Sequence, residues 1–216
     1  MTENSVEGRE DSRDVIRHLT LLGDALQNID LGDGTRESAL VPQPRNPWKL
    51  TVLEVAEQGP LRAIPRDATH VGIALDGGWT IEASGLLKGG AKSIEGALET
   101  LAAAADEFES VFTRLIDIAL ETGLPTIICT LVPARHLDPS RQQVAATALA
   151  IFNDRILRKA FAARISIVEL RLVCDEDGDY ASETLLSRAG VRKVANVARS
   201  ALYEISQEPG RTRVYF

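Results

Sequence analysis

Five short, mostly apolar runs recur along this sequence and constrain its fold more than any other feature. They are residues 18–22, 48–56, 69–75, 126–132 and 166–173. Apolar runs of this length are typical of strands that are covered on both faces of a sheet. They are too short for a membrane-spanning helix, which needs ~20 apolar residues. The sequence therefore predicts a five-stranded sheet with two buried faces.

Helical patterns fill the spaces between the later runs. Ser93 is a favoured N-cap, and Gly123 followed by Pro125 ends the apolar period that begins there. Asp138-Pro139 marks a second helix start. A last helix is predicted over about 186–206. The residues expected to face the core are Leu98, Leu101, Ala105, Phe108, Phe112 and Leu115 in the first helix, Val144, Ala148, Phe152, Ile156 and Ala160 in the second, and Val191, Val194, Val197, Ala198, Ala201 and Leu202 in the last.

Strands that alternate with helices indicate a parallel sheet with right-handed crossovers. We therefore predict the α/β class: one three-layer α/β/α domain over 15–207 with the flavodoxin-like strand order 2-1-3-4-5. Residues 1–14 are polar and charge-rich and are predicted to be a disordered leader. Residues 208–216 form a tail that we expect to be partly ordered because its end is aromatic.

Composition narrows the class of partner and the compartment. The chain has 216 residues, of which 44% are hydrophobic and 25% charged, as in ordinary soluble domains. Its net charge of −7 argues against nucleic-acid binding. The polar N-terminus lacks the apolar stretch of a signal peptide, so we expect a cytoplasmic protein without membrane contact. Cys129 and Cys174 lie in apolar segments and are predicted to be buried free thiols. We expect no cofactor.

Polar and small residues follow the predicted strands, where an open parallel sheet binds its ligands. These residues are Gly23, Asp24, Ala25 and Asn28 after the first strand, Gly59 after the second, Asp76, Gly78 and Trp79 after the third, Arg135 and His136 after the fourth, and Asp179 after the fifth. They predict a mostly acidic ligand site. The acidic segment 175–179 lacks the spacing of a calcium loop, so we expect no metal.

Some of these positions resemble the sequence blocks of the SGNH (GDSL) hydrolases. In that family Gly-Asp-Ser follows the first strand, with an asparagine three residues further on, and this chain has Gly23-Asp24-Ala25 and Asn28. Gly59 fits the family's glycine after the second strand, whose backbone N–H helps hold the oxyanion. The resemblance extends over about residues 15–205 and implies an SGNH-type fold.

The chain departs from the family where the resemblance implies chemistry. Ala25 stands at the nucleophilic serine and Gly78 at the oxyanion-binding asparagine. When the last block is aligned on Ser187 and Gly190, the histidine base falls at Leu185. Losing the nucleophile or the base costs on the order of 10⁶ in kcat, and an oxyanion-hole side chain contributes roughly 10²–10³. The resemblance therefore implies that ordinary ester hydrolysis is lost.

Three functions are compatible with these residues. The first is a degenerate SGNH-like protein that binds a small molecule, peptide or protein partner in the former substrate cleft, where Trp79 could stack on the ligand. The second is an enzyme with relocated acid/base chemistry, with Asp24 and Asp76 as a carboxylate pair and His136 assisting. The third is an SGNH esterase in which Ala25 replaces a native serine.

Overall fold

A computed structural model describes residues 17–23, 25–26, 48–54, 63–83, 85–86, 93–208 and 210–216, without the side chains of Trp79 and Ala83. The predicted leader 1–14 lies outside these residues. The described strands form one parallel sheet in the order β2-β1-β3-β4-β5-β6. The strands are β1 (Arg17–Leu22), β2 (Trp48–Leu53), β3 (His70–Ile73), β4 (Thr126–Cys129), β5 (Ser166–Val168) and β6 (Val214–Tyr215).

The predicted fold class and the order of the five predicted strands are confirmed, and β6 adds a sixth strand beside β5. This strand comes from the predicted tail, whose Val214 pairs with Ile167. No helix among the described residues is long and apolar enough to cross a membrane.

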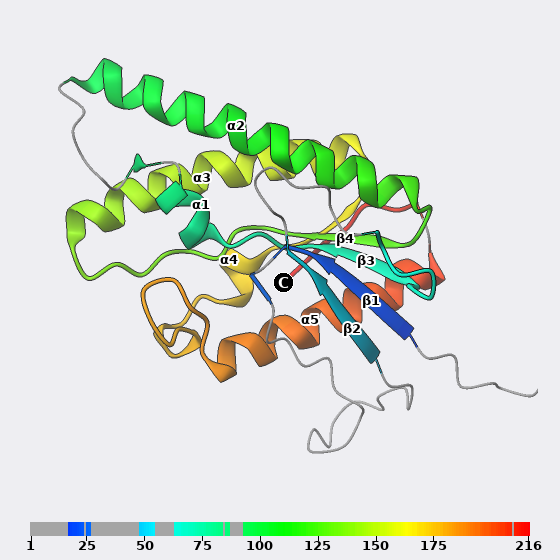
Figure 1. Cartoon of the computed structure of the whole chain (residues 1–216). Coiled ribbons are helices and arrows are strands. Elements are labelled where there is room, and N and C mark those ends of the chain that lie inside the picture. The colour runs from blue at the N-terminus through cyan, green and yellow to red at the C-terminus, as the bar shows by residue number, and fades with distance from the viewer. Residues whose placement is uncertain are drawn as a thin grey trace, which may run out of the picture.

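Helices cover both faces of the sheet (Figure 1). They are α1 (Gly77–Ala83), α2 (Ile94–Glu121), α3 (Pro139–Ala162), α4 (Leu170–Val173) and α5 (Arg188–Gln207). Helices α2 and α3 lie on one side of the sheet and α5 lies on the other. Both predicted N-caps are confirmed: the Ser93 side chain accepts a hydrogen bond from the Gly96 N–H, and the Asp138 side chain accepts one from the Arg141 N–H.

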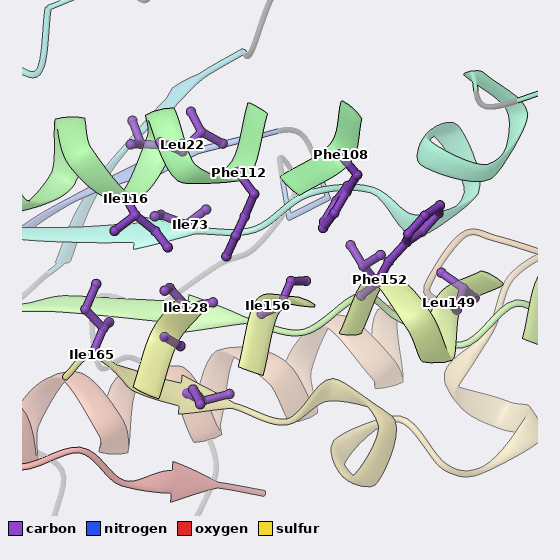
Figure 2. Packing of buried hydrophobic residues seen from close by; sticks show 14 of the residues in the cluster. Leu22, Ile73, Phe108, Phe112, Ile116, Ile128, Leu149, Phe152, Ile156 and Ile165 are labelled. Carbon is purple, nitrogen blue, oxygen red and sulfur yellow. The ribbon is translucent and has the colours of Figure 1, made fainter. Parts of the chain in front are cut away.

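The larger hydrophobic core lies between the sheet and helices α2 and α3. Figure 2 shows Phe108 and Phe112 of α2 pointing toward α3 and the strands. The Phe108 ring lies 5.1 Å from the Phe152 ring of α3, close enough for aromatic stacking. A second core lies under α5 and includes Cys129 and Cys174, which are both buried and unpaired as predicted.

Two residues predicted to be buried are exposed. Leu98 is 61% exposed because the first turns of α2 extend beyond the strand ends, and the first buried residue of that helix is Ala105 (Figure 1). Val144 is 40% exposed, while its neighbour Ala145 is buried. The predicted stripe used strict steps of four residues, and each step turns a helix about 40° beyond a full circle. Extended back to Val144, the stripe leaves the buried face.

The predicted fifth strand is too long. It was expected to cover 166–173, but β5 ends at Val168 and the chain turns into α4. The Glu169 side chain accepts a hydrogen bond from the Arg171 N–H, which caps this short helix. The apolar run continues through the change from strand to helix, so hydrophobicity alone did not reveal the boundary.

Candidate functional site

Glycine allows the chain to leave β1 at the carboxyl end of the sheet. Gly23 has φ of +120°, and its N–H donates a hydrogen bond to the Leu53 carbonyl of β2 at 3.0 Å. A Cβ at this position would collide with the Ala74 carbonyl oxygen beyond β3. Only glycine tolerates both the dihedral angle and this close approach. The geometry places Ala25, two residues later, beside the end of β3, where its N–H lies 3.4 Å from the Ala74 carbonyl oxygen.

A pocket lies where the carboxyl ends of these strands meet. It is small: the space that a water-sized molecule can reach is about 20 Å³, roughly the room of one water molecule. Its described lining comes from the ends of β1, β3 and β4 and from the loop that precedes α5. The lining residues are Ala25, Asp76, Gly77, Gly78, Val132, Pro133, Ala134, Thr184, Leu185 and Leu186.

The pocket brings together Ala25, Gly78 and Leu185, which come from three separate segments. Each was predicted to occupy a position that carries chemistry in the SGNH hydrolases. Asp76, a fourth predicted residue, also lines the pocket. Asp24, Asn28 and Gly59 lie outside the described residues, as does the side chain of Trp79, so their place at the site stays a prediction.

Asp76 caps helix α1 and accepts hydrogen bonds from two N–H groups in its first turn. Its Oδ1 accepts a hydrogen bond from the Gly78 N–H at 2.7 Å, and its carbonyl oxygen accepts one from the Thr80 N–H at 3.1 Å. The Gly78 N–H is therefore bonded to a carboxylate. A group that stabilises an oxyanion has to point toward the substrate oxygen instead.

Thr184 occupies the space beside Gly78 where a longer side chain would lie. A Cβ added to Gly78 would come within 2.7 Å of both Cβ and Cγ2 of Thr184, and within 3.2 Å of Asp76 Oδ1. Real Cβ atoms do not approach other atoms so closely, so a side chain at 78 requires a shift of Thr184. Sequence reasoning missed Thr184, although the alignment of the last block placed it one residue before Leu185.

His136 lies next to the pocket and is held by Glu183. Its Nδ1 lies 2.8 Å from Glu183 Oε2, and its side chain is only 3% exposed. The Leu137 N–H donates a hydrogen bond to Glu183 Oε1, and the Arg135 N–H donates one to the Glu183 carbonyl oxygen at 2.7 Å. The hydrogen bond from His136 lowers the pKa of the Glu183 carboxyl. Glu183 thus joins the loop after β4 to the loop before α5.

Arg135 and Asp179 contact other parts of this region. Among the described residues, neither they nor His136 belongs to the pocket lining. The Arg135 guanidinium donates to the Asp175 carbonyl oxygen and lies 5.0 Å from the centre of the Tyr180 ring. Asp179 is buried, and its Oδ2 lies 3.0 Å from Lys193 Nζ.

Lys193 neutralises the acidic segment that follows β5. Its Nζ also lies 3.0 Å from Glu176 Oε2, and the hydrogen bonds that it donates to Asp179 and Glu176 raise the pKa of Lys193. A cluster of three or more residues able to ligate a metal does not occur in the described part of the chain. The position of Lys193 accounts for this in the acidic segment, because its ammonium group lies among the carboxylates.

Comparison with known proteins gives this fold a context. No model of a protein family matches the chain, and no curated protein sequence matches it. The chain does match several solved structures of hydrolases. LAE5, an alpha/beta hydrolase from the metagenome of Lake Arreo in Spain, has a TM-score of 0.54 and 13% identity, over 87% of this chain and 95% of that one. Phospholipase A1 from Streptomyces albidoflavus NA297 has a TM-score of 0.52 and 12% identity, over 86% of this chain and 99% of that one.

A GDSL-like lipase from Bacteroides thetaiotaomicron VPI-5482 has a TM-score of 0.49 and 12% identity, over 88% of this chain and 89% of that one. At 12–13% identity, the similarity to LAE5 and the phospholipase concerns the fold alone. The chain therefore has the parallel α/β fold of LAE5 and the phospholipase over nearly their whole length.

Proposed function

We propose that this chain is a degenerate member of the SGNH superfamily that lacks ordinary esterase activity and binds a ligand in the former substrate cleft. The observation that carries the proposal is the joint presence of Ala25, Gly78 and Leu185 in one pocket. They come from three segments, and each stands at a position where the family has a reactive or oxyanion-binding side chain. Their meeting in space supports the alignment that assigned those positions.

The backbone around the pocket supports the same proposal. The N–H of Gly78 is bonded to Asp76, and Thr184 takes the space that an asparagine at 78 would need. The described lining of the pocket holds no serine or cysteine nucleophile and no histidine base, the groups that form and break an acyl-enzyme. What remains is a mostly apolar pocket with a few polar groups, the usual composition of a small-molecule site.

The experiment uses short p-nitrophenyl esters and a fluorophosphonate probe, which labels activated serines. The protein and its Ala25→Ser variant are compared with an active serine esterase as the positive control. We expect neither form to hydrolyse the esters or take up the probe, because a serine at 25 still lacks a histidine at Leu185. Stoichiometric labelling of the unmodified protein at any serine would contradict the proposal. Labelling of Ala25→Ser alone would favour an esterase whose native serine has been replaced.

A second candidate function is acid/base catalysis without a serine nucleophile. The contact that favours it is the pair formed by His136 and Glu183. With Glu183 ionised, Nδ1 of His136 donates the hydrogen bond to it, so Nε2 is the ring nitrogen that could take part in a proton transfer. Turnover of any substrate that is lost in His136→Gln but kept in Ala25→Gly would favour this candidate over the binding protein.

A further inference from the structure

We propose that the first two turns of helix α2, residues 94–101, form a docking surface for a basic amphipathic helix of a partner protein. This surface, the α2 overhang, contributes no residue to the described lining of the pocket. Its partner is therefore independent of any ligand of the cleft. Three features support the proposal: an exposed continuation of a buried apolar stripe, an acidic flank, and the way in which α3 covers the same pattern further along α2.

The apolar stripe of α2 is longer than the part of it that is buried. Phe112 belongs to this stripe and lies in the core, and the first fully buried residue of the helix is Ala105. At about 100° per residue, three apolar residues of the overhang lie within about 40° of Phe112 around the helix axis. They are Ile94, Leu98 and Leu101. Ile94 is 82% exposed and Leu98 is 61% exposed, so the described part of this chain leaves much of their apolar surface uncovered.

One flank of the α2 overhang is acidic. Glu95 and Glu99 lie about 100–140° from the direction of Phe112, on the side of the helix where Asp106 also lies. Residues 94–113 include no lysine or arginine. In the described part of the chain, the acidic residues of α2 that form ion pairs are Asp106 and Glu109, and neither glutamate of the overhang is among them. A second copy docked on the same surface would bring like charges together, so self-association is disfavoured.

Helix α3 shows which kind of surface matches this pattern. It runs beside α2 (Figure 1), and its Phe152 ring lies 5.1 Å from the Phe108 ring. One turn further along α3, the Arg155 guanidinium lies 3.3 Å from Asp106 Oδ1 and 2.6 Å from Glu109 Oε2. An apolar side chain and a basic side chain of one helix thus cover the stripe and the acidic flank together.

This cover ends before the α2 overhang. Glu95 precedes Asp106 by eleven residues, about three helical turns, and so lies on the same side of α2. The residue of α3 at the same distance before Arg155 is Val144, which is uncharged and 40% exposed. Charge complementarity therefore favours a partner helix that repeats what α3 supplies further along: an apolar stripe with lysine or arginine on one flank.

The test measures how three fluorescently labelled helical peptides bind the full-length protein, using fluorescence anisotropy. The first peptide consists of leucine and lysine, with leucines spaced i, i+3, i+4 and i+7. In the second, glutamate replaces lysine, and the third has the composition of the first in scrambled order. We expect the first peptide to bind about ten-fold more tightly than either of the others, and its affinity to fall as the salt concentration rises.

A variant of the apolar stripe locates the binding surface. Leu98→Ser should weaken binding of the leucine–lysine peptide about ten-fold, because the peptide loses an apolar contact. The matched control is Leu120→Ser, which changes a leucine that is 48% exposed at the other end of the same helix and should leave the affinity unchanged. Both leucines are largely exposed, and thermal unfolding checks that the variants are folded.

A second pair of variants tests the charge. Glu95→Gln combined with Glu99→Gln should weaken binding by about two- to five-fold, since exposed ion pairs are individually weak. Asp117→Asn combined with Glu121→Gln removes the same charge from the far end of α2 and should change the affinity less.

Several outcomes would overturn the inference. Equal binding of the scrambled peptide would show a general attraction of cations, and equal binding of the leucine–glutamate peptide would remove the role of charge. If the leucine–lysine peptide does not bind, or binds Leu98→Ser as tightly as the unmodified protein, the overhang is not its docking surface. A dimer in sedimentation velocity that Leu98→Ser abolishes would make a second copy of this chain the occupant.

Discussion

The two ends of the sheet differ in the side chains that they bury. At the amino end, His70 Nε2 lies 2.7 Å from Ser206 Oγ and its Nδ1 lies 2.8 Å from Thr69 Oγ1. His18, on the neighbouring strand, has Nε2 at 2.8 Å from Thr51 Oγ1. Both histidines are buried. At the carboxyl end, by contrast, the pocket is lined mainly by small and apolar residues.

This difference shows that residue type alone is a poor guide to chemistry in this chain. Two of its three histidines are packed inside the amino end, where their hydrogen bonds hold β1, β2, β3 and α5 together. The third, His136, holds two loops together through Glu183. The carboxyl end, where an open parallel sheet binds its ligands, has fewer such polar side chains in the described lining of its pocket. The predictions below test this contrast.

The largest expected effect is the pH dependence that His70 contributes at the amino end. Burial, with a contribution from the Arg17 charge, lowers its pKa from 6.5 to about 4. Between these values the unfolded chain binds the proton more readily, so this contribution to stability is complete above pH 6.5 and declines as the pH falls toward 4. The full loss is about 3 kcal/mol. Urea unfolding at pH 7.5 and 4.5 measures it.

The matched variant for this measurement is His70→Gln, which keeps a side-chain donor for Ser206. We expect its stability to decrease less between the two pH values than that of the unmodified protein. His136→Gln serves as the control for removal of a histidine elsewhere. If the free energy of unfolding depends equally on pH in the protein and in His70→Gln, His70 does not have a lowered pKa in the folded protein.

A smaller effect is expected from filling the glycine position at the carboxyl end. Gly78→Ala should destabilise the fold by about 1–3 kcal/mol, because the new Cβ overlaps Thr184. Gly178→Ala is the control, since no atom lies within 4 Å of its added Cβ, and it should change stability by less than about 0.5 kcal/mol. Thermal or urea unfolding measures both variants.

The double variant Gly78→Ala with Thr184→Gly tests the cause of this effect. Removing the Thr184 side chain should recover much of the loss, and the recovery appears as a coupling energy between the two positions. If Gly78→Ala is as stable as the unmodified protein, Thr184 moves aside easily and the pocket is less tightly built than its geometry suggests.

The smallest effect is expected at the loop contact between His136 and Glu183. Glu183→Gln should lower the melting temperature by less than Gly78→Ala does, because the side chain is 46% exposed and surface ion pairs contribute little. Since the folded-state pKa of Glu183 is lowered, its contribution is present above its ordinary pKa and is lost as the pH falls through the folded value. Glu99→Gln, on the exposed side of α2, is the control. A larger loss than in Gly78→Ala would make this contact a main support of the pocket.

Much of the fold could be predicted because its signals are local. Ser93 and Asp138 are helix N-caps in the sequence and in the structure. The alternation of strands and helices predicted a parallel sheet, and the order of the first five strands follows. The end of β5 was missed because apolar residues continue into helix α4. The change is marked by a hydrogen bond that the Glu169 side chain accepts from the Arg171 N–H and by one that the Leu170 N–H donates to Thr130 Oγ1.

The candidate site was harder to predict because its contacts join distant segments. The contact of Thr184 with Gly78 spans more than a hundred residues and follows no hydrophobic period. The Glu183 contact with His136 likewise comes from an irregular loop that has no sequence pattern of its own. Ala25 and Gly78 could be selected from the strand ends alone, because parallel strands bring those ends to one edge. Their roles stay predictions.

The contact between Gly78 and Thr184 also restricts the order in which these positions can change. A larger residue at 78 overlaps Thr184, while loss of the Thr184 side chain alone leaves unfilled space beside the glycine. Substitutions at the two positions are therefore epistatic, and a side chain at 78 is accessible only after the residue at 184 has become smaller. A single substitution at Gly78 therefore lowers the stability of the fold, even where the pair of substitutions would be tolerated.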